Sequence, residues 1–390
     1  MIGGHTGPCG LNKITNKCKK SSTGTTDCEL SKKGACKKIQ LIQRSVKGFI
    51  HNLEIIIKYY ELNPENIKGV VFKNRNYVKF INILKLYPKS NIDSLVNLKK
   101  HFIQNGIKNP KVVIEKAAEY IKTGNVNLAL KAKQLPEFSS FINLTKIYGV
   151  GPKKAIALYK KHHIVNRQDL SKKILITPTI LNAKQKIGLK YFKDLNTRIL
   201  RKEIDAYKRK FTAIQKHVPG LIFSINGSYR RGLTSSGDID VLITSSDPTK
   251  TPGNIRKKFI NLLIQKGIII EALAEGKIKF MGISKLTKRS KARHIDIIDT
   301  TPEKYCFAQL YFTGSGGFNI QMRMHAKNKG YILNEHSIND LKTKKPVKPS
   351  IIQSIIGKPV LTDEKDIFNF LGLKYLPPAK RNIATKGKIN

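Results

Sequence analysis

Apolar residues recur three and four positions apart in four consecutive segments of the first third of the chain. This spacing is typical of amphipathic helices, and Gly or Pro closes or closely follows each segment. Four short helices in succession predict one small helical domain over residues 46–132. The segments are VKGFIHNLEIIIKYYEL, NRNYVKFINILKLYP, NIDSLVNLKKHFIQNG and PKVVIEKAAEYIKTG.

A second helical unit is predicted over residues 137–200, after a Pro-containing link (KAKQLPEFSS). A long helix follows Arg201, and short runs rich in β-branched residues then predict a sheet domain over 201–299. Those runs are LIFSINGS, DIDVLITSS, GKIKFMGISKL and RHIDIIDTT. Helical and strand patterns mix over 300–380, which indicates a last α/β unit, and 381–390 is predicted to be a disordered tail. The pattern therefore predicts an α+β fold.

The chain carries 73 Lys and Arg against 26 Asp and Glu, a formal net charge of +47. This excess favours nucleic acid as a partner, because neutralised phosphates release counterions. An AT-rich coding genome also enriches Lys, so composition assigns no single Lys to DNA. There is no run of 18 apolar residues and no secretory leader, so we expect an intracellular protein with no membrane partner.

Residues 1–45 hold few large apolar groups and are predicted to be a flexible basic segment that adds nonspecific DNA affinity. Its four cysteines, Cys9, Cys18, Cys28 and Cys36, are separated by eight, nine and seven residues. Zinc sites usually contain a closer cysteine pair, so reduced thiols are favoured over a metal site. The stretch CGLNKITNKCKK resembles a two-cysteine repeat of large DNA viruses, which suggests a viral origin.

Acidic residues are scarce, yet Asp238 and Asp240 lie one residue apart at the start of a predicted strand. Alternate strand residues share a face, so the two carboxylates point the same way. Asp296 and Asp299 face opposite sides of the strand RHIDIIDTT, so only one of them can join the pair, and Asp296 is chosen because it lies between two isoleucines that look buried. Three carboxylates on two strands suit a pair of Mg²⁺ ions for phosphoryl transfer.

The segment before these carboxylates has the residues expected for phosphate binding. Gly227-Ser228 permits a tight turn whose N–H groups can approach a phosphate. The guanidinium of Arg231 can donate two parallel hydrogen bonds to phosphate oxygens. The alternative is a solvated strand end beside a charged turn. The whole pattern GS…RRG…GDID favours the functional interpretation over this alternative.

Three segments resemble the family X DNA polymerases of the nucleotidyltransferase superfamily. GSYRRGLTSSGDIDVLIT is similar to the signature of the family, YFTGSGGFNIQMRMHA to its nucleotide-selecting segment, and DEKDIFNFLGLKY to its C-terminal end. Within the family the match looks closest to DNA polymerase beta and covers about residues 46–380. It implies a helical lyase domain, a helix-hairpin-helix subdomain, a palm with a mixed sheet, and a small α/β nucleotide-binding subdomain.

The resemblance implies that Asp238, Asp240 and Asp296 bind two Mg²⁺ ions, for which Mn²⁺ can substitute, and that Asp296 helps to deprotonate the primer 3′-hydroxyl. It also implies a set of residues that bind the incoming nucleotide. Those near the triphosphate are Arg201, Gly227, Ser228, Arg231, Ser236 and Gly237. Those near the sugar and base are Tyr311, Phe312, Thr313, Gly314, Asn319 and Arg323, with Glu335 as the partner of Arg323 on closure.

In the polymerase segments, four positions depart from the family pattern. Gly316 and Ile320 stand where the family has side chains that pack on the incoming base and the template, which affects base selection rather than chemistry. His294 replaces an arginine near the third aspartate. Ile298 replaces another arginine that restrains the open state, so the balance between open and closed forms is expected to differ.

The segment LTKIYGVGPKKAIALYKK places Gly149 and Gly151 before the N-terminus of a helix. Such a turn presents N–H groups and a positive dipole end to a DNA phosphate without reading bases. The alternative is an ordinary Gly-Pro turn between helices. The family resemblance adds a K⁺ or Na⁺ ion bound by backbone carbonyls, at positions that match Thr145, Ile147 and Val150.

The helical domain resembles the deoxyribose-phosphate lyase domain of the family, and EYIKTG aligns Lys116 with the Schiff-base lysine. Positive charge near Lys116 and a binding site for the 5′-phosphate would come from Lys73, Arg75 and Lys79. Tyr77 matches a tyrosine of the family. The first hairpin, NGIKNPK, has one Gly where two are expected, and Phe72 replaces a histidine. The alternative is that Lys116 is merely a solvated lysine.

The sequence thus predicts a template-directed DNA polymerase that fills short gaps in base excision repair, with lyase activity. Its expected partners are gapped or nicked duplex DNA, deoxynucleoside triphosphates, a DNA ligase and an AP endonuclease, and a monomer is expected. The alternatives are an end-joining polymerase of the same family, an RNA-tailing nucleotidyltransferase, and a non-catalytic DNA-binding protein. Host nucleus, viral factory and virion stay open as locations.

Overall fold

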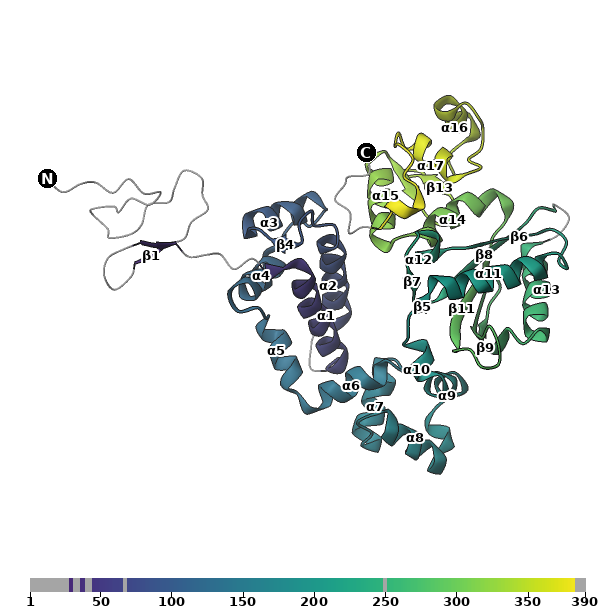
Figure 1. Ribbon diagram of the computed structural model, residues 1–390. Helices are drawn as coiled ribbons and strands as arrows, with labels where there is room; N and C mark the ends of the chain where they lie inside the picture. Colours follow the sequence, from purple (N-terminus) through teal and green to yellow (C-terminus); the bar gives the residue numbers. More distant parts are fainter. Residues whose placement is uncertain (1–27, 31–35, 39–43, 66–68, 248–250, 383–390) are drawn as a thin grey trace.

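The computed structural model describes residues 28–30, 36–38, 44–65, 69–247 and 251–382, the first two ranges as backbone only. From residue 44 onward the chain forms three parts: a helical region, a sheet domain and a C-terminal domain (Figure 1). Helices α6 to α10 connect the arm formed by α1 to α5 with the sheet domain. Most of the predicted segment 1–45 lies outside the described residues, which there form two short paired strands, β1 (Cys28–Leu30) and β2 (Cys36–Lys38).

The helical region holds the four helices that the apolar spacing predicted, and the first has the predicted bounds. One hydrophobic core runs through the whole region, so the predicted link at KAKQLPEFSS is part of two packed helices. The helices are α1 (Val46–Leu62), α2 (Val70–Leu84), α3 (Leu95–Gln104), α4 (Lys111–Thr123), α5 (Asn127–Gln134), α6 (Pro136–Thr145), α7 (Pro152–His162), α8 (Arg167–Ile176), α9 (Ala183–Lys190) and α10 (Phe192–Leu195). Strands β3 (Arg44–Ser45) and β4 (Asn91–Ile92) and the 3-10 helix η1 (Pro178–Ile180) complete it.

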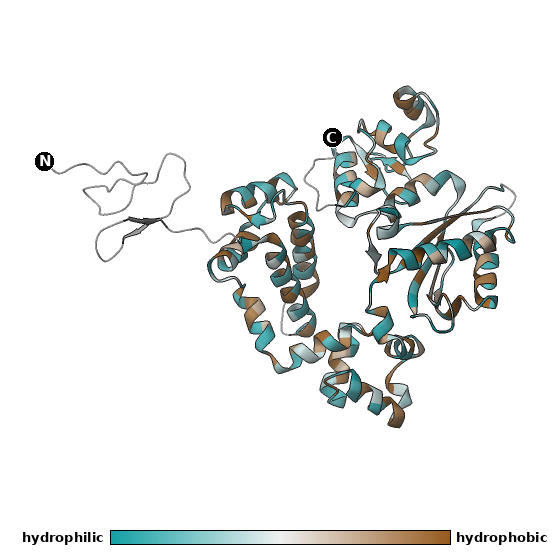
Figure 2. Cartoon of the chain, in the orientation of Figure 1, coloured by the Kyte–Doolittle hydropathy of each residue, from teal (hydrophilic) through white to brown (hydrophobic). Residues whose placement is uncertain are grey.

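Polar residues at the predicted boundaries fix where these helices begin. The side chain of Ser45 accepts a hydrogen bond from the Gly48 N–H at the start of α1, and Asn182 and Gln185 form a capping box at the start of α9. Hydrophobic and hydrophilic residues are interleaved along the helices in Figure 2, as expected for elements with one buried face. No described helix is both long and apolar enough to cross a membrane.

The sheet domain is built on five strands in the order β6-β8-β11-β10-β9, with β8 and β11 parallel and the other pairs antiparallel. Strand β9 was not predicted, because its Glu-Ala-Leu-Ala composition is typical of helices. The main strands are β6 (Leu221–Ile225), β8 (Ile239–Ser245), β9 (Ile269–Glu275), β10 (Lys279–Ser284) and β11 (Arg293–Asp299). The domain also contains β5 (Ile199–Leu200), β7 (Ser235–Ser236), α11 (Arg201–Gln215), α12 (Gly227–Arg230) and α13 (Pro252–Gln265).

The two faces of this sheet pack against different elements. Ile239, Val241, Ile295 and Ile297 share a buried core with residues of α11 and α13. The intervening strand positions face the other way, where Leu242 and Ile298 pack against Ala308 of the C-terminal domain. The sheet is therefore covered by helices on one face and partly by the C-terminal domain on the other.

The C-terminal domain has its own core and extends two residues further than predicted. Arg381, assigned from the sequence to a disordered tail, is fully buried, and its guanidinium packs beside Phe318, Phe368 and Tyr375. The elements are η2 (Pro302–Lys304), α14 (Tyr305–Thr313), α15 (Gly316–Asn328), β12 (Tyr331–Leu333), β13 (Ile338–Asp340), α16 (Pro349–Ile356), α17 (Glu364–Phe370) and η3 (Pro378–Lys380).

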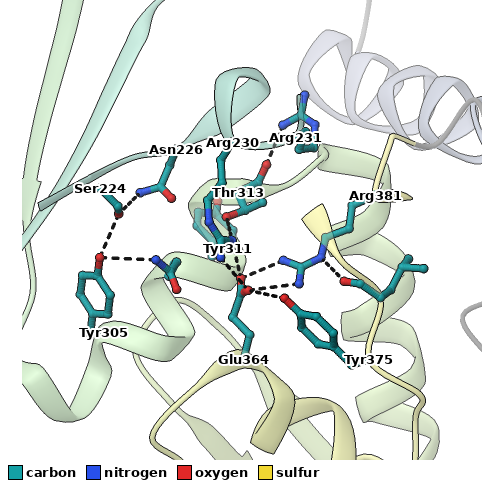
Figure 3. Close-up of polar contacts among 12 residues, drawn as sticks. Ser224, Asn226, Arg230, Arg231, Tyr305, Tyr311, Thr313, Glu364, Tyr375 and Arg381 are labelled. Carbon is teal, nitrogen blue, oxygen red and sulfur yellow. Dashed lines mark hydrogen bonds and ion pairs between the residues drawn. The ribbon is translucent and has the colours of Figure 1, made fainter. Parts of the chain in front are cut away.

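Glu364 joins the C-terminal domain to the sheet domain. Its carboxylate accepts two hydrogen bonds from Arg230 of α12, at 2.9 and 3.0 Å, and two from Arg381, at 2.8 and 3.2 Å (Figure 3). Burial alone raises the pKa of Glu364, but the two arginines outweigh burial and hold the pKa below its ordinary 4.5. The ionised form is therefore the one that stabilises the fold.

We expect Glu364→Gln to lower the free energy of unfolding by about 3 to 5 kcal/mol at neutral pH, because the buried Arg381 and the partly buried Arg230 lose their counter-charge. A carboxyl group whose pKa is lower in the folded state stabilises fully above its unfolded pKa, near 4.5, and loses this contribution as pH falls through the folded pKa. Urea unfolding between pH 7 and 3 should therefore be less pH-dependent in the variant. Glu61→Gln, which breaks a surface pair with Lys58, should cost less than about 1 kcal/mol, and an equal cost for both would contradict the assignment.

Candidate active site and DNA-binding interface

The parallel pairing of β8 and β11 brings two of the predicted carboxylates together. Asp240 and Asp296 are direct partners in the register of the two strands. Asp238 precedes β8 by one residue and lies on the Asp240 side of the chain, because side chains two residues apart share a face. Asp299 instead receives a hydrogen bond of 2.7 Å from the buried Arg256, so it belongs to the fold and not to the site.

Asp238, Asp240 and Asp296 concentrate negative charge where β8 and β11 pair. Burial, followed by the charges of Asp238 and Asp296, raises the pKa of Asp240 to about 7. Lys279 and Arg231 act in the opposite direction but do not cancel the shift. A carboxylate in this setting favours a proton or a metal ion as its neighbour.

Asp296 is buried and has an unsatisfied oxygen. Its Oδ2 lies 2.5 Å from the ammonium nitrogen of Lys279, while Oδ1 receives no hydrogen bond from the described residues and lies 3.4 Å from His294 Nδ1. The Nε2 atom of His294 is also buried without a hydrogen-bond partner among them. Unpaired buried polar atoms are costly, so both atoms indicate a missing ligand.

Gly227 holds the phosphate-binding turn against Asp240. The Gly227 backbone has φ +57°, and a Cβ atom at this position would overlap Asp240 Oδ2. The next residue, Ser228, donates a hydrogen bond of 2.8 Å from its hydroxyl to the hydroxyl of Ser236. Only glycine allows this close approach of the α12 turn to the carboxylate.

One pocket of about 550 Å³ gathers most of the predicted nucleotide-binding residues. Its wall combines the turn at α12, the aspartates and the end of α14, which come from distant parts of the sequence. The predicted residues in its wall are Gly227, Ser228, Arg231, Gly237, Asp238, Asp240, Tyr311, Phe312, Gly314 and Asn319. Ser236, Thr313 and Arg323 are not part of this wall. Ser236 and Thr313 are buried, and the Arg323 guanidinium is 5.0 Å from the Tyr311 ring and 3.4 Å from Glu335.

Arg198, and not Arg201, lines this pocket. Arg201 was predicted to bind the triphosphate, but its guanidinium stacks on the Tyr229 ring at 4.4 Å and donates to the Tyr229 carbonyl. Arg198 lies three residues earlier and donates to the hydroxyl and carbonyl oxygens of Ser235. The sequence prediction missed Arg198 because two arginines flank the same short strand, and apolar spacing does not decide which one faces the site.

The turn after α14 is fixed by polar contacts with the phosphate-binding segment. Arg231 donates 2.6 Å to the Thr313 carbonyl, and Arg230 donates 2.6 Å to the Thr313 hydroxyl (Figure 3). Asn319 donates 2.8 Å to the Tyr311 carbonyl. Gly314 has φ +63° and ψ −153°, a conformation that glycine adopts readily and other residues rarely do.

The predicted hairpin faces the carboxylates across a second pocket, of about 620 Å³. Thr145, Ile147, Gly149, Val150 and Gly151 line one side. Gly237, Asp238 and His294 line the other. The hairpin is held by Gln185, whose amide donates 2.9 Å to the Gly149 carbonyl. The two predicted sites therefore converge, with Gly237 and Asp238 in the walls of both pockets.

The predicted lyase residues lie on two helices of the helical region. Lys116 on α4 forms an ion pair of 2.7 Å with Glu119, and 21% of its side chain is exposed. The Tyr77 hydroxyl on α2 is close enough to feel the Glu119 charge, although burial is the main cause of its raised pKa. Lys73 packs over Tyr60, Arg75 lies over the exposed Phe72, and Lys79 donates to the Gly106 carbonyl. Glu119 was not foreseen as the partner of Lys116.

The three aspartates fit divalent metal ions by their chemistry. They offer hard oxygen donors, burial together with the charges of Asp238 and Asp296 raises the pKa of Asp240, and Oδ1 of Asp296 has no hydrogen-bond partner among the described residues. In the described part of the chain, no three acidic, His or Cys side chains converge closely enough to form a ready-made metal cluster. At Asp296 the ammonium of Lys279 provides a counter-charge instead.

Three family models match consecutive parts of the chain. The fingers domain of DNA polymerase lambda matches residues 143–196, the DNA polymerase beta palm matches 198–302, and the DNA polymerase beta thumb matches 308–382. The chain belongs to family X of the DNA polymerases. Family X enzymes use divalent metal ions, in keeping with the carboxylates described above.

Two curated relatives show how far the family X likeness extends. DNA polymerase lambda of Rattus norvegicus is 31% identical over 343 residues, which are 85% of this chain and 55% of the relative. DNA polymerase lambda of Arabidopsis thaliana is 28% identical over 320 residues, 79% of this chain and 58% of the relative. The chain therefore spans little more than half the length of these relatives. The viral origin suggested by the cysteine repeat stays a prediction.

We expect Gly227→Ala to destabilise the protein more than Gly232→Ala. Both glycines have a positive φ, which costs an alanine about 1 to 2 kcal/mol, but only the Gly227 variant also forces the Asp240 carboxylate to move. At Gly232 the nearest atom to an added Cβ is 3.9 Å away. Urea unfolding of the two variants measures the difference, and equal losses would show that α12 does not press on Asp240.

Proposed function

We propose that the protein is a template-directed DNA polymerase that fills short gaps in duplex DNA during base excision repair. The observation that carries this proposal is the position of Asp238 and Gly237 in the walls of both pockets. One pocket has the residues for a nucleoside triphosphate, and the other has a hairpin suited to a DNA phosphate. A reaction that joins a nucleotide to a DNA end needs both ligands to meet at one catalytic group.

The nucleotide pocket has the charges and the shape for a deoxynucleoside triphosphate. Arg198, Arg231 and the Ser228 turn provide cationic and polar groups for the phosphates. From the family resemblance, the turn from Tyr311 to Gly314 would face the sugar, where a 2′-hydroxyl would clash. Selection by a fixed backbone turn favours DNA synthesis over the RNA-tailing alternative.

Asp238, Asp240 and Asp296 would hold two Mg²⁺ ions, with Mn²⁺ as a substitute. When bound, the ions neutralise charge on the triphosphate and acidify the primer 3′-hydroxyl. The 3′-oxygen forms a bond to the α-phosphorus while the bond to pyrophosphate breaks, and the hydroxyl proton passes to a carboxylate. Asp296 suits this proton transfer, because its Oδ1 lacks a hydrogen-bond partner among the described residues.

The hairpin would hold the DNA backbone next to this site. The turn before α7 lies at the N-terminal end of a helix and suits a phosphate, and a K⁺ or Na⁺ ion would bind the carbonyls of Thr145, Ile147 and Val150. These contacts involve no base edges, so the affinity of the hairpin for DNA would not depend on the DNA sequence. The partners expected from the pathway, a DNA ligase and an AP endonuclease, and an intracellular location are proposed on the same grounds.

A second activity, removal of a 5′-deoxyribose phosphate, is supported by the cluster around Lys116. Its partly buried amine would attack the sugar aldehyde and form a Schiff base with loss of water. The Glu119 carboxylate, 2.7 Å away, is placed to accept the proton that the amine must lose first. Lys73 and Arg75 on α2 would supply positive charge for the 5′-phosphate.

We expect Asp296→Asn to reduce gap filling by several orders of magnitude while gapped DNA still binds, because the variant removes a metal-binding charge and a proton acceptor. Incorporation of one nucleotide into a one-nucleotide gap, with binding measured on the same DNA, tests this. Asp205→Asn is the control, since Asp205 contacts the Tyr229 hydroxyl and not the site. Near-normal incorporation by Asp296→Asn would overturn the proposed function.

We expect Lys116→Ala to remove most of the covalent adduct that borohydride traps on DNA with a 5′-deoxyribose phosphate. Gap filling should change little, because the lyase residues lie in the helical region and the aspartates in the sheet domain. Lys122→Ala, an exposed lysine on the same helix, should trap normally. Undiminished trapping by Lys116→Ala would place the nucleophile elsewhere, with Lys73 and Lys111 the next to test.

A further inference from the structure

Lys279 contacts the third carboxylate of the proposed site from the neighbouring strand. In the antiparallel register of β10 and β11, Met281 pairs with Asp296 and Lys279 pairs with Ile298. Lys279 is thus a diagonal neighbour of Asp296 on the same face, a position from which a long side chain can reach across. Its ammonium nitrogen lies 2.5 Å from Asp296 Oδ2.

This ion pair offsets part of the charge of the cluster. Lys279 also acts on Asp240, where its charge opposes the raised pKa. The site therefore already holds one cation in the absence of metal. The ammonium group contacts Oδ2 and leaves Oδ1 open, so a divalent ion and Lys279 compete for Oδ2 of Asp296.

We propose that Lys279 takes the place of a metal ion at Oδ2 of Asp296, and that a divalent ion which binds this oxygen must displace it. This inference rests on the proposed metal-dependent function and adds a residue that controls metal entry. Lys279 fits the role, because 39% of its side chain is exposed and its four-carbon stem can swing toward solvent. Asp296, of whose side chain 12% is exposed, stays in place on its strand.

Metal affinity in the absence of DNA and nucleotide tests this without any measurement of activity. We expect Lys279→Met and Lys279→Gln to bind Mn²⁺ about tenfold more tightly than the parent protein, as measured by electron paramagnetic resonance of free Mn²⁺. Lys279→Arg keeps the cation and should resemble the parent. Lys277→Met removes the same charge from an exposed residue two positions away and should change the affinity little.

Two further comparisons separate direct competition from a general change in charge. In an Asp296→Asn background, Lys279→Met should no longer alter Mn²⁺ affinity, because the shared carboxylate is gone. At high salt, which screens distant charges, the effect of Lys279→Met should persist. An unchanged or weaker affinity in Lys279→Met and Lys279→Gln, or an equal gain in Lys277→Met, would overturn the inference.

The parent protein gives an independent measurement that needs no neutral variant. With ¹³C-labelled lysine, the ε-methylene signal of Lys279, assigned from Lys279→Arg, should shift toward that of a solvated lysine when Mg²⁺ is added. A signal that does not move while metal binds would contradict displacement. Mn²⁺ binding that depends on Asp240 but not on Lys279 would refute this inference alone, whereas no binding to any variant would refute the metal site itself.

Discussion

The parallel pairing of β8 with β11 is the constraint on which the site depends. It sets Asp240 beside Asp296, and the chain direction adds Asp238 at the strand entrance. Burial and the neighbouring carboxylates both disfavour the ionised form of Asp240 and raise its pKa, so this arrangement opposes the fold. The arrangement persists because Ile239, Ile295 and Ile297, which adjoin the aspartates on the two strands, share a core with α11 and α13. The carboxylates cannot turn away without exposing these isoleucines.

The segment that follows β6 connects this charged cluster to the rest of the molecule. Gly227 approaches Asp240, and Ser228 is bound to Ser236. Arg230 contacts Glu364, and Arg231 contacts the Thr313 carbonyl. Consecutive residues of one short turn thus position the carboxylates, the phosphate pocket and the C-terminal domain. A change in the C-terminal domain can reach the carboxylates through this turn.

Much of the fold and of the site could be predicted from the sequence, because the decisive patterns are local. The apolar spacing predicted the bounds of α1. The DID pattern at 238–240 and the IDI pattern at 295–297 predicted strands with carboxylates on one face. Contacts between distant residues could not be predicted in this way. Lys279 approaches Asp296 only through the register of β10, and Arg381 is buried only because Glu364 and three aromatic rings surround it.

The choice between Arg198 and Arg201 shows the same limit. Both flank strand β5, and the pairing of that strand with β7 decides which side chain faces the pocket. Glu119 near Lys116 is a different case, since the two lie three residues apart on one helix and the spacing itself signals an ion pair. The counter-charge of a residue on a helix can thus be predicted from residues three or four positions away. A counter-charge on a neighbouring strand can be predicted only when the register of the two strands is known.

The most direct test of the central claim is an anomalous-scattering map from crystals grown with gapped DNA, a deoxynucleoside triphosphate and Mn²⁺. The account predicts two peaks about 3.5 to 4 Å apart, each about 2.1 Å from oxygens of Asp238, Asp240 or Asp296. The triphosphate should lie along the Ser228 and Arg231 side of the pocket. Manganese bound away from these aspartates, or none bound while DNA and nucleotide are in place, would contradict it.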